Sequence, residues 1–158
     1  PNKYRYLKMG VMHNKKMIAR IQIPHSIYQM MLAHLQVTYP QEGCGLLGGH
    51  IEQGSKVAHV THLYVIENHL HSPTAYEMAP TQQLQAMLDL EAQGSDTIAA
   101  YHSHPQGQSV PSETDIAQAY YPELVHLIVS LQQRDQPIVR AFHILNKNVE
   151  EIALNITT

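Results

Sequence analysis

The spacing of apolar residues changes repeatedly along the chain, and this change limits the fold more than any other feature of the sequence. Apolar residues at every second position predict a β-strand, whereas a spacing of three and four predicts an amphipathic helix. Residues 17–23 alternate in this way, and Pro24 ends the segment. Six later segments are short and apolar, which is typical of strands. They cover residues 44–51, 56–66, 97–104, 124–131, 138–145 and 149–156.

Helical spacing predicts three helices between these strands. The first covers residues 27–35, and the third covers residues 112–121. The second begins at Thr81, which we expect to be its N-cap, and ends at residue 93. The expected order is therefore strand, helix, strand, strand, helix, strand, helix and three strands.

This order indicates an α/β (α+β) fold in which helices sandwich a mixed sheet. A length of 158 residues fits one domain. Residues 1–16 show no clear period and contain several Lys and Arg residues, so we expect a basic N-terminal arm followed by a domain over residues 17–158.

Composition excludes several classes of protein. Cys44 is the one cysteine of the sequence, so an intrachain disulfide and a four-cysteine metal site are excluded. No apolar run approaches the roughly 20 residues that cross a bilayer, and no secretory signal opens the sequence, so we expect a cytoplasmic protein without a membrane partner. Six of the ten Lys and Arg residues lie among the first 41 positions, but they are dispersed, so we expect no nucleic-acid partner.

The residues most suggestive of chemistry are His102 and His104, followed by Asp115. Residues two apart on a strand point to the same face, so the two imidazoles can lie side by side. Asp115 falls in the first turn of the next predicted helix, after a loop long enough to fold back. Two imidazoles and one carboxylate suit a catalytic zinc ion, which keeps a fourth position open for water.

Each of these residues also has an ordinary explanation. The sequence contains 12 histidines, and His69 and His71 form a second pair with the same spacing. Asp115 could instead complete a capping box with Ser112. Spacing alone therefore leaves both the metal site and these structural explanations open.

Two stretches carry a family resemblance. Residues 42–48 read Glu-Gly-Cys-Gly-Leu-Leu-Gly, and residues 102–105 read His-Ser-His-Pro, with Ser112 and Asp115 after a six-residue gap. Together they resemble the JAMM motif of the MPN (JAB) zinc metallopeptidases, and every motif position is matched. The resemblance covers residues 17–156 and is greatest to the short bacterial branch. It implies a cytidine-deaminase-like fold and one zinc ion per chain, held by the two histidines and Asp115.

The resemblance also assigns two catalytic roles. Composition does not distinguish Glu42 from Glu67, Glu77 or Glu113, but the family pattern places its catalytic glutamate at Glu42. A carboxylate beside zinc can take a proton from the bound water and return it to the leaving amine. The pattern also implies that Ser112 donates a hydrogen bond to the developing oxyanion. An ordinary N-cap remains the alternative role of Ser112.

Cys44 offers a different mechanism, that of a cysteine–histidine hydrolase. It lies between two glycines ahead of an apolar strand, where a lone cysteine is usually buried and inert. Tyr76 and Tyr101 are candidates to line a substrate groove, although core packing is the commoner role of such residues.

The function implied by the resemblance is that of a zinc-dependent peptidase or isopeptidase. Its substrate would be a ubiquitin-like or sulfur-carrier protein, cleaved at an amide bond on the Gly-Gly C-terminus. A homodimer is a possible assembly. One alternative is a non-catalytic MPN scaffold or binding module, which predicts broken motif residues. The other is a JAMM hydrolase with a different peptide substrate. All five motif residues are present, which argues against the scaffold.

Overall fold

The computed structural model describes residues 17–158, so the expected basic arm lies outside the described residues. The elements follow the expected order. The strands are β1 (Arg20–Pro24), β2 (Cys44–Ile51), β3 (Val57–Ile66), β4 (Asp96–His104), β5 (Val125–Ser130), β6 (Ile138–Leu145) and β7 (Asn148–Thr157). The helices are α1 (His25–Thr38), α2 (Pro80–Ala92) and α3 (Glu113–Ala117).

The strands form one mixed sheet that closes on itself. Its order is β1-β3-β2-β4-β5-β6-β7, and β7 pairs with β1 in parallel. β2 is antiparallel to both β3 and β4, whereas β4 and β5 are parallel. A mixed sheet with helices is confirmed, and the closure of the sheet into a barrel is a feature that the element order does not predict. The right-handed twist of strands lets the sheet curl, and β1 then joins its two ends.

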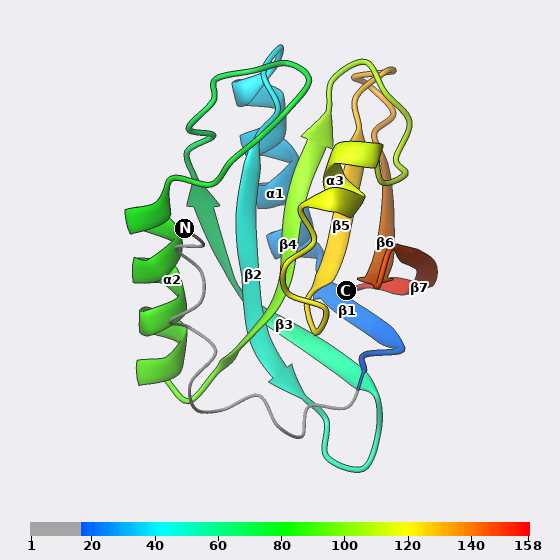
Figure 1. The fold of residues 1–158 in the computed structure, drawn as a ribbon. Coiled ribbons are helices and arrows are strands. Elements are labelled where there is room, and N and C mark those ends of the chain that lie inside the picture. The colour runs from blue at the N-terminus through cyan, green and yellow to red at the C-terminus, as the bar shows by residue number, and fades with distance from the viewer. Residues whose placement is uncertain (1–16) are drawn as a thin grey trace.

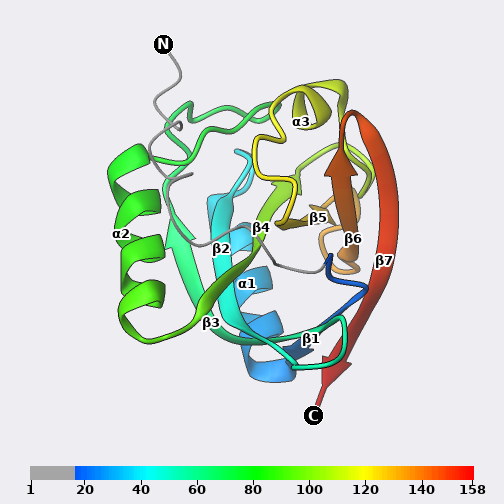
Figure 2. The same cartoon turned by 60° about the horizontal axis from the view of Figure 1, so that its bottom comes forward.

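Helix α1 packs into the concave side of this curled sheet, as Figure 2 shows. Met31 and Leu35 of the helix are fully buried against strand residues such as Leu47, Tyr101 and Leu127. Met30 of the same helix is exposed, so only one of these two adjacent methionines belongs to the core. The concave core fixes the curvature of the sheet and therefore the positions of its strand ends.

Helices α2 and α3 lie on the convex side, on either side of β2 and β4 (Figure 1). The expected N-cap of α2 is wrong: the cap is Ala79, without a side-chain hydrogen bond, and Pro80 occupies the first turn. Pro is favoured there because its missing N–H has no partner in a helix start. The third helix is shorter than expected and ends at Ala117. Within residues 17–158, no helix is both long and apolar enough to span a membrane.

Candidate metal centre

The C-terminal end of β4 presents His102 and His104 on the convex side of the sheet. Both histidines are buried, because β4 runs between β2 and β5. Their Nε2 atoms lie 3.0 Å apart. The alternation of a strand therefore brings the two imidazoles together, as their spacing predicts.

Asp115 reaches the same point from the start of α3. Its Oδ2 lies 3.2 Å from Nε2 of His102 and 3.1 Å from Nε2 of His104. A capping box holds it there: the backbone N–H of Ser112 donates to Oδ2 of Asp115 at 2.9 Å, and Ser112 Oγ accepts from the backbone N–H of Asp115 at 3.0 Å. The capping and metal-binding interpretations of Asp115 are thus compatible, since one carboxylate takes part in both contacts.

The three ligand atoms suit a cation. They lie within 4.8 Å of one another, and they are the one such group found among the described residues. Nδ1 of His104 donates to the carbonyl of Gln108 at 2.7 Å, so in the neutral imidazole Nε2 carries a lone pair. Ligand atoms around a tetrahedral zinc ion are about 3.3–3.6 Å apart, close to the spacing here.

The electrostatics favour a neutral His102 and an ionised Asp115. Complete burial lowers the pKa of His102. Burial opposes ionisation of Asp115, but hydrogen bonds from the two histidines outweigh it and hold its pKa well below the usual range. These are the protonation states in which imidazole and carboxylate bind a metal ion.

Glu42 lies beside this group because β2 and β4 are antiparallel and Cys44 pairs with His102. The side chain is buried, and its Oε2 has no hydrogen-bond partner among the described residues. Burial raises the pKa of Glu42 to about 8, with His104 opposing the shift and Asp115 adding to it. A carboxyl group with a pKa near neutrality can both accept and return a proton.

The backbone around Glu42 is held firmly. Its N–H donates to the carbonyl of Ser72 at 2.8 Å, and its carbonyl accepts from Nδ2 of Asn68 at 2.9 Å. The next N–H, that of Gly43, donates to Ser103 Oγ at 2.9 Å. These contacts fix the carboxyl group relative to β4, which a proton-transfer group requires.

Two other sequence candidates lie elsewhere. Cys44 is fully buried, and burial raises the pKa of its thiol to about 12. Its Sγ donates to the carbonyl of Ile66 at 3.4 Å, so the thiol is part of the core. Tyr101 is also fully buried on the concave side, where its hydroxyl lies 2.9 Å from Nδ1 of His34. Neither residue lines a groove.

Tyr76 does face the metal-binding group. Its ring stacks on His102 with 4.4 Å between ring centroids. Nδ1 of His102 has no hydrogen-bond partner among the described residues, so on that edge of the ring no hydrogen bond supplements the stacking contact. Tyr76 comes from the segment between β3 and α2, whose path the sequence does not predict.

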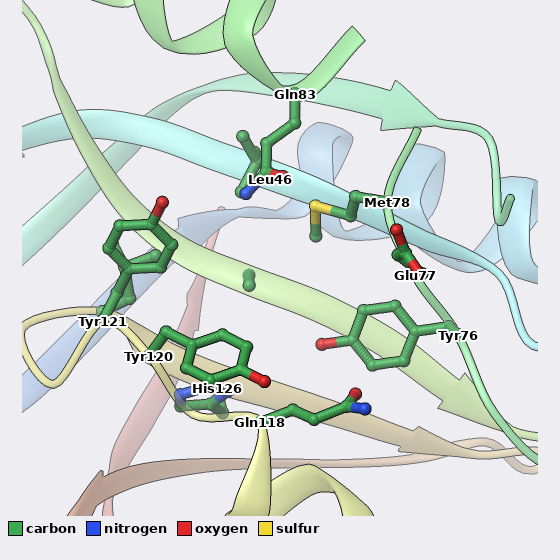
Figure 3. Close-up of a pocket in the computed structure, with 11 residues that line it drawn as sticks. Leu46, Tyr76, Glu77, Met78, Gln83, Gln118, Tyr120, Tyr121 and His126 are labelled. Atoms are coloured by element: carbon green, nitrogen blue, oxygen red, sulfur yellow. The ribbon is translucent and has the colours of Figure 1, made fainter. Parts of the chain in front are cut away.

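Tyr76 also forms one wall of a pocket of about 220 Å³ on the convex side of the sheet (Figure 3). Aromatic, amide and apolar side chains and one carboxylate share the remaining lining: Leu46, Glu77, Met78, Gln83, Ala100, Gln118, Tyr120, Tyr121, Leu124 and His126. His126 is 8% exposed, and burial lowers its pKa to about 4. Of the lining residues, sequence reasoning named only Tyr76, as a candidate to line a groove; the lone histidine within an apolar strand was a second available signal.

Comparison with known proteins gives consistent matches. A family model described as prokaryotic homologs of the JAB domain matches residues 24–144. The CysO-cysteine peptidase of Mycobacterium tuberculosis is 28% identical over 126 residues, which cover 80% of this chain and 84% of that protein. A desampylase of Haloferax volcanii is 37% identical over 92 residues, covering 58% of this chain and 63% of that protein.

A solved structure also matches over most of the chain. The solution structure of a protein from Desulfitobacterium hafniense superposes with a TM-score of 0.79 at 32% identity. The match covers 87% of this chain and 92% of the other. A protein from Salinibacter ruber has the same fold, with a TM-score of 0.64 at 24% identity.

Proposed function

The chain belongs to the prokaryotic JAB-domain family, and from this premise we propose that it is a zinc-dependent peptidase or isopeptidase. The observation that carries the proposal is the convergence of His102, His104 and Asp115, with ligand atoms 3.0–3.2 Å apart. Each of these three atoms can offer a lone pair when the imidazoles are neutral with the proton on Nδ1 and the carboxylate is ionised, and Glu42 lies beside them. Such a set can hold a cation at its centre.

Different residues of the chain would have different roles in the reaction. Zinc bound by the two histidines and Asp115 would polarise the substrate carbonyl and acidify a bound water. Glu42 would take the proton from that water and later return it to the leaving amine. Ser112 Oγ accepts from the backbone N–H of Asp115, which leaves its own O–H free to donate to the carbonyl oxygen as negative charge develops there.

The substrate class follows from the relatives and from the pocket. Relatives carry the names CysO-cysteine peptidase, desampylase and probable TtuB-protein conjugate cleaving protease. We infer that this chain likewise cleaves an amide bond at the Gly-Gly C-terminus of a ubiquitin-like or sulfur-carrier protein. Two glycines allow the substrate backbone to approach the buried ligands closely, because they carry no side chain.

The pocket lies where an extended C-terminal tail would pass. Ala100 of the pocket and His102 are on the same face of β4, about 7 Å apart along the strand. An extended peptide covers that distance with two residues. If the scissile carbonyl lies at the metal, the residue before Gly-Gly therefore reaches the pocket walls formed by Tyr76 and Tyr120.

The cytidine-deaminase-like arrangement, the cytoplasmic location and the homodimer stay predictions. The alternative of a non-catalytic scaffold is disfavoured by the intact set of ligand atoms and by the buried carboxyl group of Glu42. A hydrolase acting on a different peptide remains an outcome of the test below.

The test is metal content combined with cleavage. We expect elemental mass spectrometry to give about one zinc per chain, and we expect cleavage of a carrier protein extended by an amino acid after Gly-Gly. Chelation should abolish cleavage, and added zinc should restore it. His104→Ala should lose both zinc and activity, whereas His69→Ala, an exposed control, should lose neither.

Absence of zinc after incubation with the metal would support the scaffold instead. Zinc binding without cleavage of any Gly-Gly conjugate would point to a different peptide substrate.

A further inference from the structure

The two candidate histidine ligands are held in different ways. Nδ1 of His104 donates to the carbonyl of Gln108 at 2.7 Å, whereas Nδ1 of His102 has no such partner among the described residues. The second nitrogen of a metal-binding imidazole usually donates to an acceptor that fixes the orientation of the ring. The position of the Gln108 carbonyl therefore decides where Nε2 of His104 points.

Gln108 lies in the loop of residues 105–111, which follows β4 and has no regular structure. Side chains from outside the loop hold its backbone. Ser130 Oγ donates to the carbonyl of Gly107 at 2.7 Å, and Nε2 of Gln132 donates to the carbonyl of Gln106 at 2.8 Å. The two carbonyls directly before that of Gln108 are thus both fixed.

A third contact joins the loop to the end of α1. Nε2 of Gln106 donates to the hydroxyl of Tyr39 at 2.9 Å. The guanidinium of Arg134 lies 4.1 Å from the centroid of the Tyr39 ring, and Nε of Arg134 donates to Oε1 of Gln36 at 3.1 Å. Tyr39 is therefore itself held in place. The end of α1 that precedes it lies at the same end of the sheet as the C-terminal end of β4 (Figure 1).

The sheet supplies the fixed base for these contacts. Ser130 pairs with His104 in the register between β5 and β4, and the N–H of Leu131 donates to the carbonyl of His104 at 3.0 Å. Ser130 is 4% exposed. Leu131 therefore anchors the backbone of His104, and the adjacent Ser130 anchors the loop that orients its ring.

We propose that Tyr39, Ser130 and Gln132 form a loop clamp that positions His104 for metal binding by fixing the carbonyl of Gln108. These are positioning residues, because none of them touches the ligand atoms of the metal-binding group. The inference rests on the proposed zinc centre and goes beyond it by assigning residues outside the motif.

Gln132→Glu is the sharpest test, because the side chain is exposed and keeps its size while losing the N–H donor. Gln133→Glu is the matched control: it makes the same charge change one position on. We expect Gln132→Glu to weaken zinc affinity about three- to tenfold, less than the roughly 10–100-fold loss of a direct partner of a ligand. Gln133→Glu should leave affinity unchanged, and neither variant should change the urea midpoint of the metal-free protein.

A second readout needs no metal. In the metal-free protein, NMR should show the Nδ1–H proton of His104 protected from exchange with water, and Gln132→Glu should speed that exchange. A purely structural role of Gln132 would change the urea midpoint without a specific effect at His104.

Ser130→Ala tests the buried arm of the clamp. Ser55 is the control, because it also lies in a connection between two elements and contacts a backbone carbonyl. In the turn between β2 and β3, its Oγ contacts the carbonyl of Glu52 and accepts from the N–H of Val57. We expect Ser130→Ala to weaken zinc affinity about tenfold, Ser55→Ala to have no effect on affinity, and Ser130→Thr to restore it.

Equal zinc affinity and equal Nδ1–H exchange in Gln132→Glu and Gln133→Glu would overturn the clamp while leaving the proposed function intact. Failure of the unaltered protein to bind zinc would overturn the proposed function. The exchange measurement would then still decide whether the clamp orients His104.

Discussion

At the scale of single residues, Glu42 is the one Asp or Glu of the described residues that is buried as a whole, and its Oε2 has no hydrogen-bond partner there. It lies beside the ligand atoms without belonging to the group that would hold zinc. Its carboxyl group would carry a proton, whereas His102, His104 and Asp115 would hold the metal. Metal binding and hydrolysis are therefore separable by substitution.

We expect Glu42→Gln to keep about one zinc per chain and to lose about 10²- to 10⁴-fold in the rate of hydrolysis. The amide keeps the size of the side chain but cannot accept the proton. Zinc content and the cleavage rate of a Gly-Gly conjugate, measured on the same sample, check this. Full activity would remove Glu42 from the mechanism.

The thiol mechanism is tested by Cys44→Ser. Burial raises the pKa of Cys44 to about 12, so the thiolate needed for attack is scarce at neutral pH. A serine hydroxyl can keep the hydrogen bond to the carbonyl of Ile66. The rate of hydrolysis should therefore stay within about twofold of the unaltered protein, because the thiol takes no part in the chemistry. Loss of activity with zinc still bound would revive Cys44 as a nucleophile.

Much of the candidate site could be predicted because its parts are close in sequence. One strand end, one loop and one helix start contain His102, His104, Ser112 and Asp115. In such elements local periodicity indicates the direction in which each side chain points. Glu42 is 60 residues from His102, and only the family resemblance singled it out. Tyr76 could not be placed, because its segment follows no regular period.

At the scale of elements, the strands were predictable from alternation in the first and from short apolar runs in the other six, whereas the closure of the sheet was not. Alternation shows which face of a strand is buried, but the pairing of β1 with β7 joins residues far apart in sequence. The predicted length of α3 is also too great. Its residues after Ala117 continue with aromatic side chains, and Tyr120 and Tyr121 pack around the pocket instead of extending the helix.

Gly49 shows how closely β2 and β3 approach each other. A Cβ at this position would lie 1.9 Å from the carbonyl oxygen of His59, a backbone atom that cannot move independently. We expect Gly49→Ala to lower the free energy of unfolding by about 3 kcal/mol, at the upper end of overpacking effects. Urea denaturation of the metal-free protein measures this.

Gly107→Ala is the matched control for this prediction. A Cβ there would meet no atom closer than Cβ of His104 at 3.4 Å, which is an ordinary contact. Its free energy of unfolding should change by less than about 0.5 kcal/mol. An equally stable Gly49→Ala variant would mean that the two strands can separate locally at little cost.

At the scale of the whole molecule, the two sides of the curled sheet have different roles. The concave side holds α1 and the larger apolar core, whereas the convex side carries the metal-binding group and the pocket. Figure 1 shows α1 and α2 on opposite sides of the sheet. β4 contributes to both sides at once. Its residue Tyr101 packs inward against α1, while Ala100 and His102 face the pocket and the ligands. Stability and chemistry are thus coupled through one strand.

His126 makes the stability of the fold depend on pH. Burial lowers its pKa to about 4 from the ordinary 6.5, so between these values the unfolded chain binds more protons than the folded one. The free energy of unfolding therefore rises with pH across this window and falls on acidification. His126 alone should cost the folded state about 2 kcal/mol between pH 7 and pH 5.

His126→Gln should remove that part of the acid sensitivity, whatever its effect on stability at pH 7, because glutamine does not titrate. The measurement is the free energy of unfolding of the metal-free protein in urea at pH 7 and pH 5. His69→Gln, an exposed control, should keep the full pH dependence of the unaltered chain. The same loss on acidification in His126→Gln would show that this imidazole can be protonated in the folded state without penalty, through opening of the pocket around it.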